Sequence, residues 1–156
     1  MCSSDLPSYP GLNSFMLSVS PSLADMVSIA ATSPNDSIMR ITGPSGTGFF
    51  AAAAINIGAS GTVTFTPSDT PPGEYPRSQQ LTLTICQTDP SSGACLTTPG
   101  PSTTVAVSNG QTVTFTIFAT GQGTRLPFIP GINRAFIVAT QGSKVVGMAD
   151  VAVKRQ

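Results

Sequence analysis

Two segments of the chain alternate strictly between threonine and large apolar residues, and they constrain the fold more than any other feature. Residues 61–66 read GTVTFT, and residues 111–117 read QTVTFTI. Successive side chains of an extended strand point to opposite faces, so Val and Phe share one face and Thr the other. Both segments are therefore predicted to be half-buried strands. The inner strands of any sandwich have inward Val and Phe and outward Thr. We therefore interpret the similarity of the two segments as a common strand pattern rather than as an internal repeat.

Seven more segments have the apolar and β-branched composition of strands: 26–31, 37–42, 49–57, 80–86, 103–107, 135–140 and 145–153. The third segment contains Ala51–Ala54. These alanines by themselves would favour a helix, but they run directly into β-branched residues and glycine, so we predict a strand for the whole segment. Turn signals such as SPND, GPSG, PPG, PGP and NG separate the segments, and 14 prolines and 15 glycines would interrupt most helices. The predicted fold is all-β, an antiparallel sandwich of about seven to nine strands.

Composition limits the partners of the chain. Its 156 residues suffice for one domain with a real core. Charged residues make up 9%, with seven basic and seven acidic side chains, so neither a nucleic-acid surface nor membrane insertion is expected. The hydrophobic fraction of 40% predicts folding rather than disorder. We expect the sandwich domain to span residues 23–156, after a leader and a linker or the end of a preceding module in residues 1–22.

The first six residues, MCSSDL, resemble the translated end of a common short-read sequencing adapter. We interpret residues 1–6 as a technical scar on a metagenomic fragment whose true N-terminus is missing. The alternative is an ordinary start followed by a flexible Ser-rich leader. On the first interpretation Cys2 does not belong to the natural protein, so the number of cysteines falls from three to two. The lack of a signal peptide then no longer argues for a cytoplasmic location.

Two cysteines, Cys86 and Cys95, remain, with eight residues between them. The apolar residues of 81–86 have odd numbers, so Cys86 shares a face with Thr82 and Thr84 and is predicted to point away from the core. It therefore does not bridge the two sheets of a sandwich. The intervening residues are turn formers that would place the cysteines opposite each other in an exposed hairpin. A disulfide there would stabilise the fold by roughly 2.5–3 kcal/mol.

Other uses of the pair are less favoured. Zinc sites use three or four Cys or His ligands, and the chain has no histidine. Redox pairs lie two residues apart at a helix N-terminus. We therefore expect a disulfide, with free thiols as the alternative and no metal ligand. A disulfide implies export, which places the chain in the extracellular space, at the cell surface or in the periplasm.

No catalytic residue and no cofactor are expected. Without histidine, Ser-His-Asp and Cys-His arrangements are excluded, and acid-base chemistry would fall to carboxylates. A glycosidase needs two of them facing each other across a cleft. Of six carboxylates outside the leader, three lie in turn contexts that explain them as turn or cap residues. The six are Asp25, Asp36, Asp69, Glu74, Asp89 and Asp150, and the three in turns are Asp36, Asp69 and Asp89.

The run TICQTDPSSGACL, followed by a Thr/Val strand and by TFTIFATGQGTRLPFIPGINRAFIVATQGSKVVGMADVAV, resembles immunoglobulin-like tail modules of secreted or surface proteins of Gram-negative bacteria. The resemblance covers residues 25–156. It implies an immunoglobulin-like β-sandwich without chemistry of its own, used as a stalk, spacer or adhesive surface. Related tails carry an acidic residue after Pro-Phe, where this chain has Ile129, so no calcium site is expected there.

Two classes of function follow. The first is a non-catalytic structural or adhesive module that contacts neighbouring modules or surface proteins. The second is an accessory module that binds a ligand or carbohydrate for a secreted hydrolase. Sugar platforms favour exposed Trp and Tyr, but the chain has no Trp and its two tyrosines lie beside prolines, which favours the first class.

The sequence also offers a candidate contact surface. The residues 127–132, PFIPGI, are too apolar for an ordinary loop. We expect Phe128 to plug the open end of the sandwich. The alternative is a surface for another module or a second copy, made by Phe128, Ile129 and Ile132. Tyr75 is the fourth candidate contact residue, and glycan binding that depends on it would favour the accessory-module class.

Overall fold

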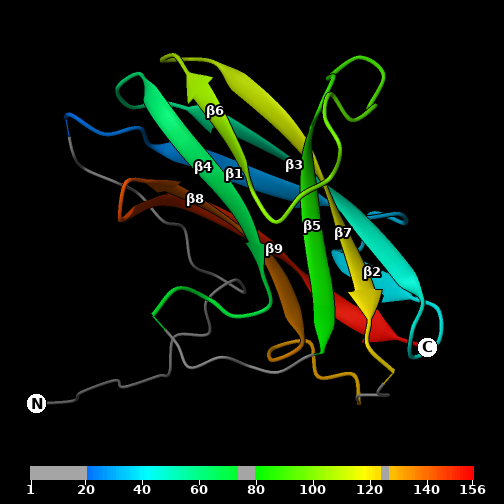
Figure 1. The fold of residues 1–156 in the computed structure, drawn as a ribbon. Helices are drawn as coiled ribbons and strands as arrows, with labels where there is room; N and C mark the ends of the chain where they lie inside the picture. Colours follow the sequence, from blue (N-terminus) through cyan, green and yellow to red (C-terminus); the bar gives the residue numbers. More distant parts are fainter. Residues whose placement is uncertain (1–20, 74–79, 124–126) are drawn as a thin grey trace, which may run out of the picture.

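The computed structural model describes residues 21–73, 80–123 and 127–156, and within them every regular element is a strand. Nine strands form two sheets that lie face to face (Figure 1). In the part of the chain so described, no helix has the length and apolar character needed to cross a membrane. The fold is therefore an all-β arrangement of two packed layers, as the alternating pattern predicted.

The four-stranded sheet, called sheet A, is antiparallel throughout. Its order is β1 (Met26–Ala31), β3 (Thr47–Asn56), β7 (Thr112–Gly121) and β5 (Leu81–Thr88). Strand β3 has small or apolar residues on both of its faces, and buried positions alternate with more exposed ones. It includes the run Ala51–Ala54, which was predicted to be extended. Pairing with β1 on one side and β7 on the other satisfies its backbone groups and overrides the helical preference of alanine.

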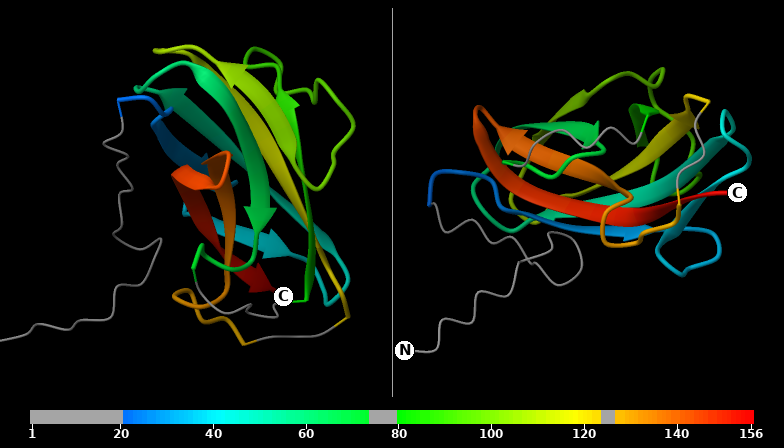
Figure 2. Two further views of the ribbon diagram at one scale, coloured as in Figure 1. Left: turned by 60° about the vertical axis from the view of Figure 1, so that its left-hand side comes forward. Right: turned by 90° about the horizontal axis from the view of Figure 1, so that it is seen from below.

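The five-stranded sheet, called sheet B, has the order β2 (Ile38–Ile41), β9 (Lys144–Arg155), β8 (Arg134–Gln141), β4 (Gly61–Ser68) and β6 (Thr103–Val107). Its β2 runs parallel to β9, from Ile38 opposite Ala152 to Ile41 opposite Arg155. The prediction of a wholly antiparallel sandwich is wrong at this one pair. Figure 2 shows the long β9 curving through the layer that it forms with β8.

All nine predicted strands exist, with ends displaced by a few residues at most. The two alternating segments lie in different sheets, one in β4 and the other in β7. Their phenylalanines, Phe65 and Phe115, are buried and meet across the interior with ring centroids 4.3 Å apart. The Val/Phe faces of both segments therefore form the center of the core, as their period predicted.

One side of the sandwich is closed by a close approach between β1 and β9. A Cβ atom at Gly147 would lie 2.1 Å from the backbone oxygen of Met26, so no larger residue fits there without a backbone shift. On this side the chain also passes from β1 in sheet A to β2 in sheet B. The first two strands therefore tie the two sheets together.

One end of the sandwich is organised by a buried asparagine, Asn56, at the end of β3. Its Oδ1 accepts the backbone N–H groups of Asp25 and Gly58, both at 3.0 Å. Its Nδ2 donates to the carbonyl oxygens of Ala59 and Ser108. The side chain is fully buried and joins three separate segments. A single amide thus makes hydrogen bonds to backbone groups of all three segments.

Candidate functional site

The disulfide predicted from the sequence is present. Cys86 in β5 and Cys95 after the following loop are joined, with their Cα atoms 5.6 Å apart. The loop between them turns back, since the N–H of Asp89 donates to the carbonyl of Ala94 and that of Leu96 to Gln87. The returning chain then pairs with the outer edge of β5, where Ile85 and Gly100 exchange two backbone hydrogen bonds. The edge of sheet A at β5 is therefore covered.

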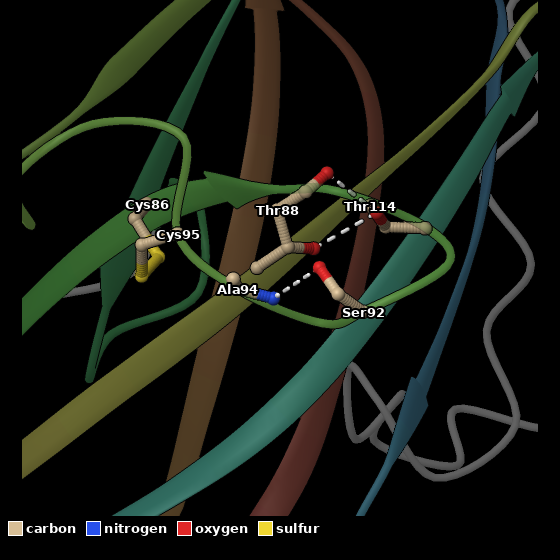
Figure 3. The surroundings of a disulfide bond; sticks show 6 residues. All are labelled: Cys86, Thr88, Ser92, Ala94, Cys95 and Thr114. Atoms are coloured by element: carbon tan, nitrogen blue, oxygen red, sulfur yellow. Dashed lines mark hydrogen bonds between the residues drawn. A yellow bond between two sulfur atoms is a disulfide. The ribbon is translucent and has the colours of Figure 1, made fainter.

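The surroundings of Cys86 differ from the expected exposed hairpin. Its register opposite Thr116 places it on the outer face of sheet A, as its parity predicted. The side chain is nevertheless fully buried, whereas Cys95 is exposed. Figure 3 shows the loop of residues 89–94 lying over the outer side of the sheet, with Thr88 and Thr114 hydrogen-bonded beneath it. The loop folds back over β5 and removes Cys86 from solvent. The alternation of residues along one strand does not predict this burial, because it contains no information about the path of the loop.

Asp89 holds the tip of this loop in shape. Its Oδ1 accepts the backbone N–H groups of Ser91 and Ser92, at 3.0 and 2.9 Å, and the hydroxyl of Ser92. The hydrogen bond from the Ser92 N–H, together with the others, lowers the pKa of the Asp89 carboxyl. The carboxylate is a turn residue, as its context predicted.

A groove of about 240 Å³ lies on the outer face of sheet A, beside this loop. Its floor is made of small side chains, mainly Ala51 and Ala53 of β3 with Thr114 and Thr116 of β7. Ile29 of β1 borders it on one side, and the disulfide-bonded loop borders it on the other through Pro90 and Gly93. Apart from Asp89 at the loop, the lining is apolar and hydroxyl-bearing, which suits an uncharged apolar group.

The loop of residues 127–132 presents an apolar cluster. Phe128, Ile129 and Ile132 are 37%, 44% and 45% exposed. Phe128 lies outside the buried core, beneath the Lys154 ammonium at 5.9 Å from the ring center, so the prediction that it plugs the sandwich is wrong. Such a contact needs a ring face open at the surface. The fourth predicted contact residue, Tyr75, lies outside the described residues, as does Glu74.

Two carboxylates line a second cleft, of about 380 Å³, next to this loop. Asp150 receives two hydrogen bonds from the buried guanidinium of Arg134, one of them from Nη2 at 3.0 Å. Asp36 is paired with Arg40 on the surface. The hydrogen bond from Arg40 lowers the pKa of Asp36 to about 2. Each of these two carboxylates is thus engaged by an arginine.

The described ranges contain no cluster of metal-ligating side chains. Within them no three His, Cys, Asp or Glu side chains converge on a common point. The remaining carboxylates are dispersed: Asp25 is buried at the end held by Asn56, and Asp69 accepts the hydroxyl of its neighbour Thr70. The structure brings the two cysteines together and gathers Phe128, Ile129 and Ile132 on one loop.

Sequence reasoning missed the uncharged character of sheet A. The strands β1, β3, β5 and β7 contain no Asp, Glu, Lys or Arg. Sheet B, by contrast, carries Arg40, Arg134, Lys144, Asp150, Lys154 and Arg155. The signal is present in the sequence, but it is recognisable only once the strands are assigned to sheets, because charged and uncharged strands are interspersed along the chain.

Comparisons with known proteins do not assign a family. No family model and no curated protein matches the chain. Among solved structures, a β-glucosidase from Listeria innocua is similar with a TM-score of 0.38 at 10% identity. The same enzyme in complex with glucose gives 0.37 at 11% identity. Each alignment covers 84% of this chain but 16% of the enzyme, so the chain spans a small part of these neighbours.

Proposed function

We propose that the chain is a non-catalytic structural or adhesive module of a larger secreted or surface bacterial protein, built as an immunoglobulin-like sandwich. The observation that carries the proposal is the Cys86–Cys95 disulfide, which covers the edge of β5. Disulfides persist in oxidising compartments, which supports an exported chain. Covering a sheet edge suits a module that works among other proteins, since exposed edges invite non-specific pairing.

The strand order supports the immunoglobulin-like assignment. Domains of that type pair strands A-B-E-D in one sheet and C-F-G in the other. Here β1, β3, β7 and β5 take the places of A, B, E and D, and β4, β8 and β9 those of C, F and G. The seven strands also follow one another in the expected order along the chain. Strands β2 and β6 are additions at opposite edges of sheet B.

The chain also departs from antibody domains in two respects. The disulfide lies at the D position instead of joining B to F, and Trp is absent from the sequence. Phe65 and Phe115 fill the center of the core instead. These differences favour a module that uses the sandwich as a frame rather than an antibody-type recognition domain.

The proposal is tested by exporting the full chain to a bacterial periplasm and assaying the purified protein. We expect the disulfide to form without added oxidant, and neither turnover of a panel of chromogenic glycosides nor retention on insoluble polysaccharides. The same chain made in the cytoplasm and kept reduced serves as the control for the contribution of the disulfide. Glycoside turnover that Asp150→Asn abolishes would contradict the proposal, as would saturable binding of soluble glycan, which instead fits an accessory module of a hydrolase.

A further inference from the structure

The outer face of sheet A is built unlike an ordinary protein surface. Soluble domains usually have about a quarter to a third of their surface residues charged, and natural sheets use charges to discourage association. The four strands of this face contain no charged residue, and the charges beside it are Asp89 at the groove and Arg40 next to Phe49. The outward positions of the face are apolar residues and threonines, including Ile29 at 67% exposure and Phe49 at 60%. A continuous uncharged face of this kind marks an interaction surface.

The face carries both a projection and a matching depression on the same strand. Phe49 of β3 projects from it, while Ala51 and Ala53 line the floor of the groove. All three side chains point outward, because the inward positions of β3 are the buried Gly48, Phe50, Ala52 and Ala54. At about 3.3 Å per residue, Phe49 and Ala53 lie roughly 13 Å apart along the strand.

This arrangement is self-complementary. A two-fold axis in the plane of contact, perpendicular to β3 and passing over Ala51, sets two β3 strands antiparallel across the interface. Phe49 of each copy then lies over Ala53 of the other. A two-fold contact repeats every interaction twice, so one projection and one depression on a single face suffice. We propose that the outer face of sheet A binds a second copy of this chain, with each Phe49 seated in the groove of the other copy.

Charge favours a second copy over other occupants. A nucleic acid or an acidic polymer would need several basic side chains, and the strands of the face have none. The strands of the two copies carry no charges that would repel each other, and the net charge of zero removes long-range repulsion between the copies. The disulfide-bonded loop bounds the groove through Pro90 and Gly93, so the depression keeps a fixed wall before association. A preformed groove lowers the entropic cost of binding.

The available area fits a weak dimer. Because the disulfide-bonded loop covers part of β5, three strands about 4.8 Å apart and about nine residues long remain, with a flat footprint of roughly 400 Å² per copy. Two such footprints, even with the relief of their side chains, stay below the ~1,200 Å² of standard interfaces and fall in the range of weak, transient contacts. Sheet faces in contact pack about 10 Å apart, which a Phe over an Ala accommodates. We therefore expect dissociation constants of about micromolar or weaker.

Sedimentation velocity of the full chain between about 5 and 500 µM tests the inference. All proteins carry Cys2→Ser, so that no dimer forms through this third cysteine. The parent is expected to shift from monomer to dimer with concentration. Phe49→Lys and Ala53→Glu should each weaken association at least tenfold, while Ile129→Lys, which adds charge at another exposed apolar position, should leave it unchanged. Circular dichroism and thermal melts verify that every variant is folded.

The two-fold arrangement makes a sharper prediction. When the Phe49→Lys and Ala53→Glu chains are mixed, one contact becomes a Lys-Glu pair and the other remains Phe on Ala, so a heterodimer should form although neither variant associates alone. A mixture that stays monomeric overturns the arrangement, as does a dimer that survives both substitutions. A parent chain that is monomeric at every concentration overturns the inference and leaves the face to another occupant, such as a neighbouring module. The inference does not depend on the proposed function.

Discussion

The rings of Phe65 and Phe115 meet across the sandwich, tilted by 38° with their centroids 4.3 Å apart. They belong to the two nearly identical alternating segments, one in β4 and one in β7. Two strands with the same alternating residue pattern thus contact each other from opposite sheets. This contact is the center of the core that every other part of the fold surrounds.

Truncation of this contact should destabilise the domain severely. We expect Phe115→Ala to lower the free energy of unfolding by about 3–5 kcal/mol, because it removes a fully buried ring and leaves a cavity. The double variant with Phe65→Ala should reveal a coupling of about 0.5–1.5 kcal/mol between the rings in urea denaturation. Phe49→Ala, measured at a concentration at which the chain is monomeric, is the matched control, and its effect should stay within about 0.5 kcal/mol because that ring is exposed in the single chain.

Removing one partner of the buried Arg134–Asp150 ion pair should lower the free energy of unfolding more than replacing both partners by apolar residues. Asp150→Ala leaves the guanidinium buried without its carboxylate and should cost about 3–5 kcal/mol. The double variant Arg134→Met/Asp150→Leu should recover most of that loss, since no charge then remains buried. Equilibrium unfolding of both variants measures the difference. Equal losses would show that the pair contributes through packing alone.

Substitution of Asn56 should lower the stability of the fold as much as substitution of an apolar core residue. Replacement of Asn56 by Ala removes four hydrogen bonds and leaves the buried backbone N–H of Asp25 without the Asn56 oxygen, so we expect a loss of about 2–4 kcal/mol. Asn109→Ala is the control, because Asn109 makes a similar bond to the Gly58 carbonyl at the surface. A melting temperature lowered by about 4–16 °C for the first variant and almost unchanged for the second would fit this role.

The disulfide should be detectable by mass and by stability. Alkylation without reduction should label one cysteine, Cys2, and the unlabelled pair should make the chain two protons lighter than its reduced form. Replacing both Cys86 and Cys95 by Ser should cost about 2.5–3 kcal/mol on the chain-entropy estimate. Three alkylated cysteines in protein prepared under oxidising conditions would rule the bond out.

The Asp36–Arg40 pair should contribute to the acid stability profile. The pKa of Asp36 is about 2 in the folded chain, against 3.8 as its ordinary value, so the folded state binds the proton less readily than the unfolded state. The contribution is therefore present above about pH 4 and is lost as the pH falls toward 2. Carboxyl NMR titration should show the low midpoint, and Arg40→Met should move it back toward the ordinary value.

The strands were predictable because their signals are local. Alternation such as that of residues 61–66 and turn formers such as Asn109-Gly110 act over a few residues, and all nine strands were located from them. The run Ala51–Ala54 was assigned correctly because its neighbours are β-branched. The parallel pairing of β2 with β9 was not predictable, since it depends on where two distant segments meet.

The candidate sites divide in the same way. The pairing of Cys86 with Cys95 followed from nearby turn residues, but the burial of Cys86 depends on how the loop folds back over β5. The exposure of Phe128 was missed because an apolar sequence does not specify which side chains find a partner. The four hydrogen bonds of Asn56 join segments that are distant in sequence, so no local pattern announces them.

The parallel pairing of β2 and β9 also bears on mechanical load. If tension is applied to the chain before β2 and after β9, the two strands are pulled in opposite directions along their common axis. Their backbone hydrogen bonds then bear the force together in shear, instead of opening one after another from an end. The bonds of Gly43 and Ile41 with Gln156 clamp the far end of the pair. Arranged in this way, the four residues of β2 would resist a pull between these two points as a single unit.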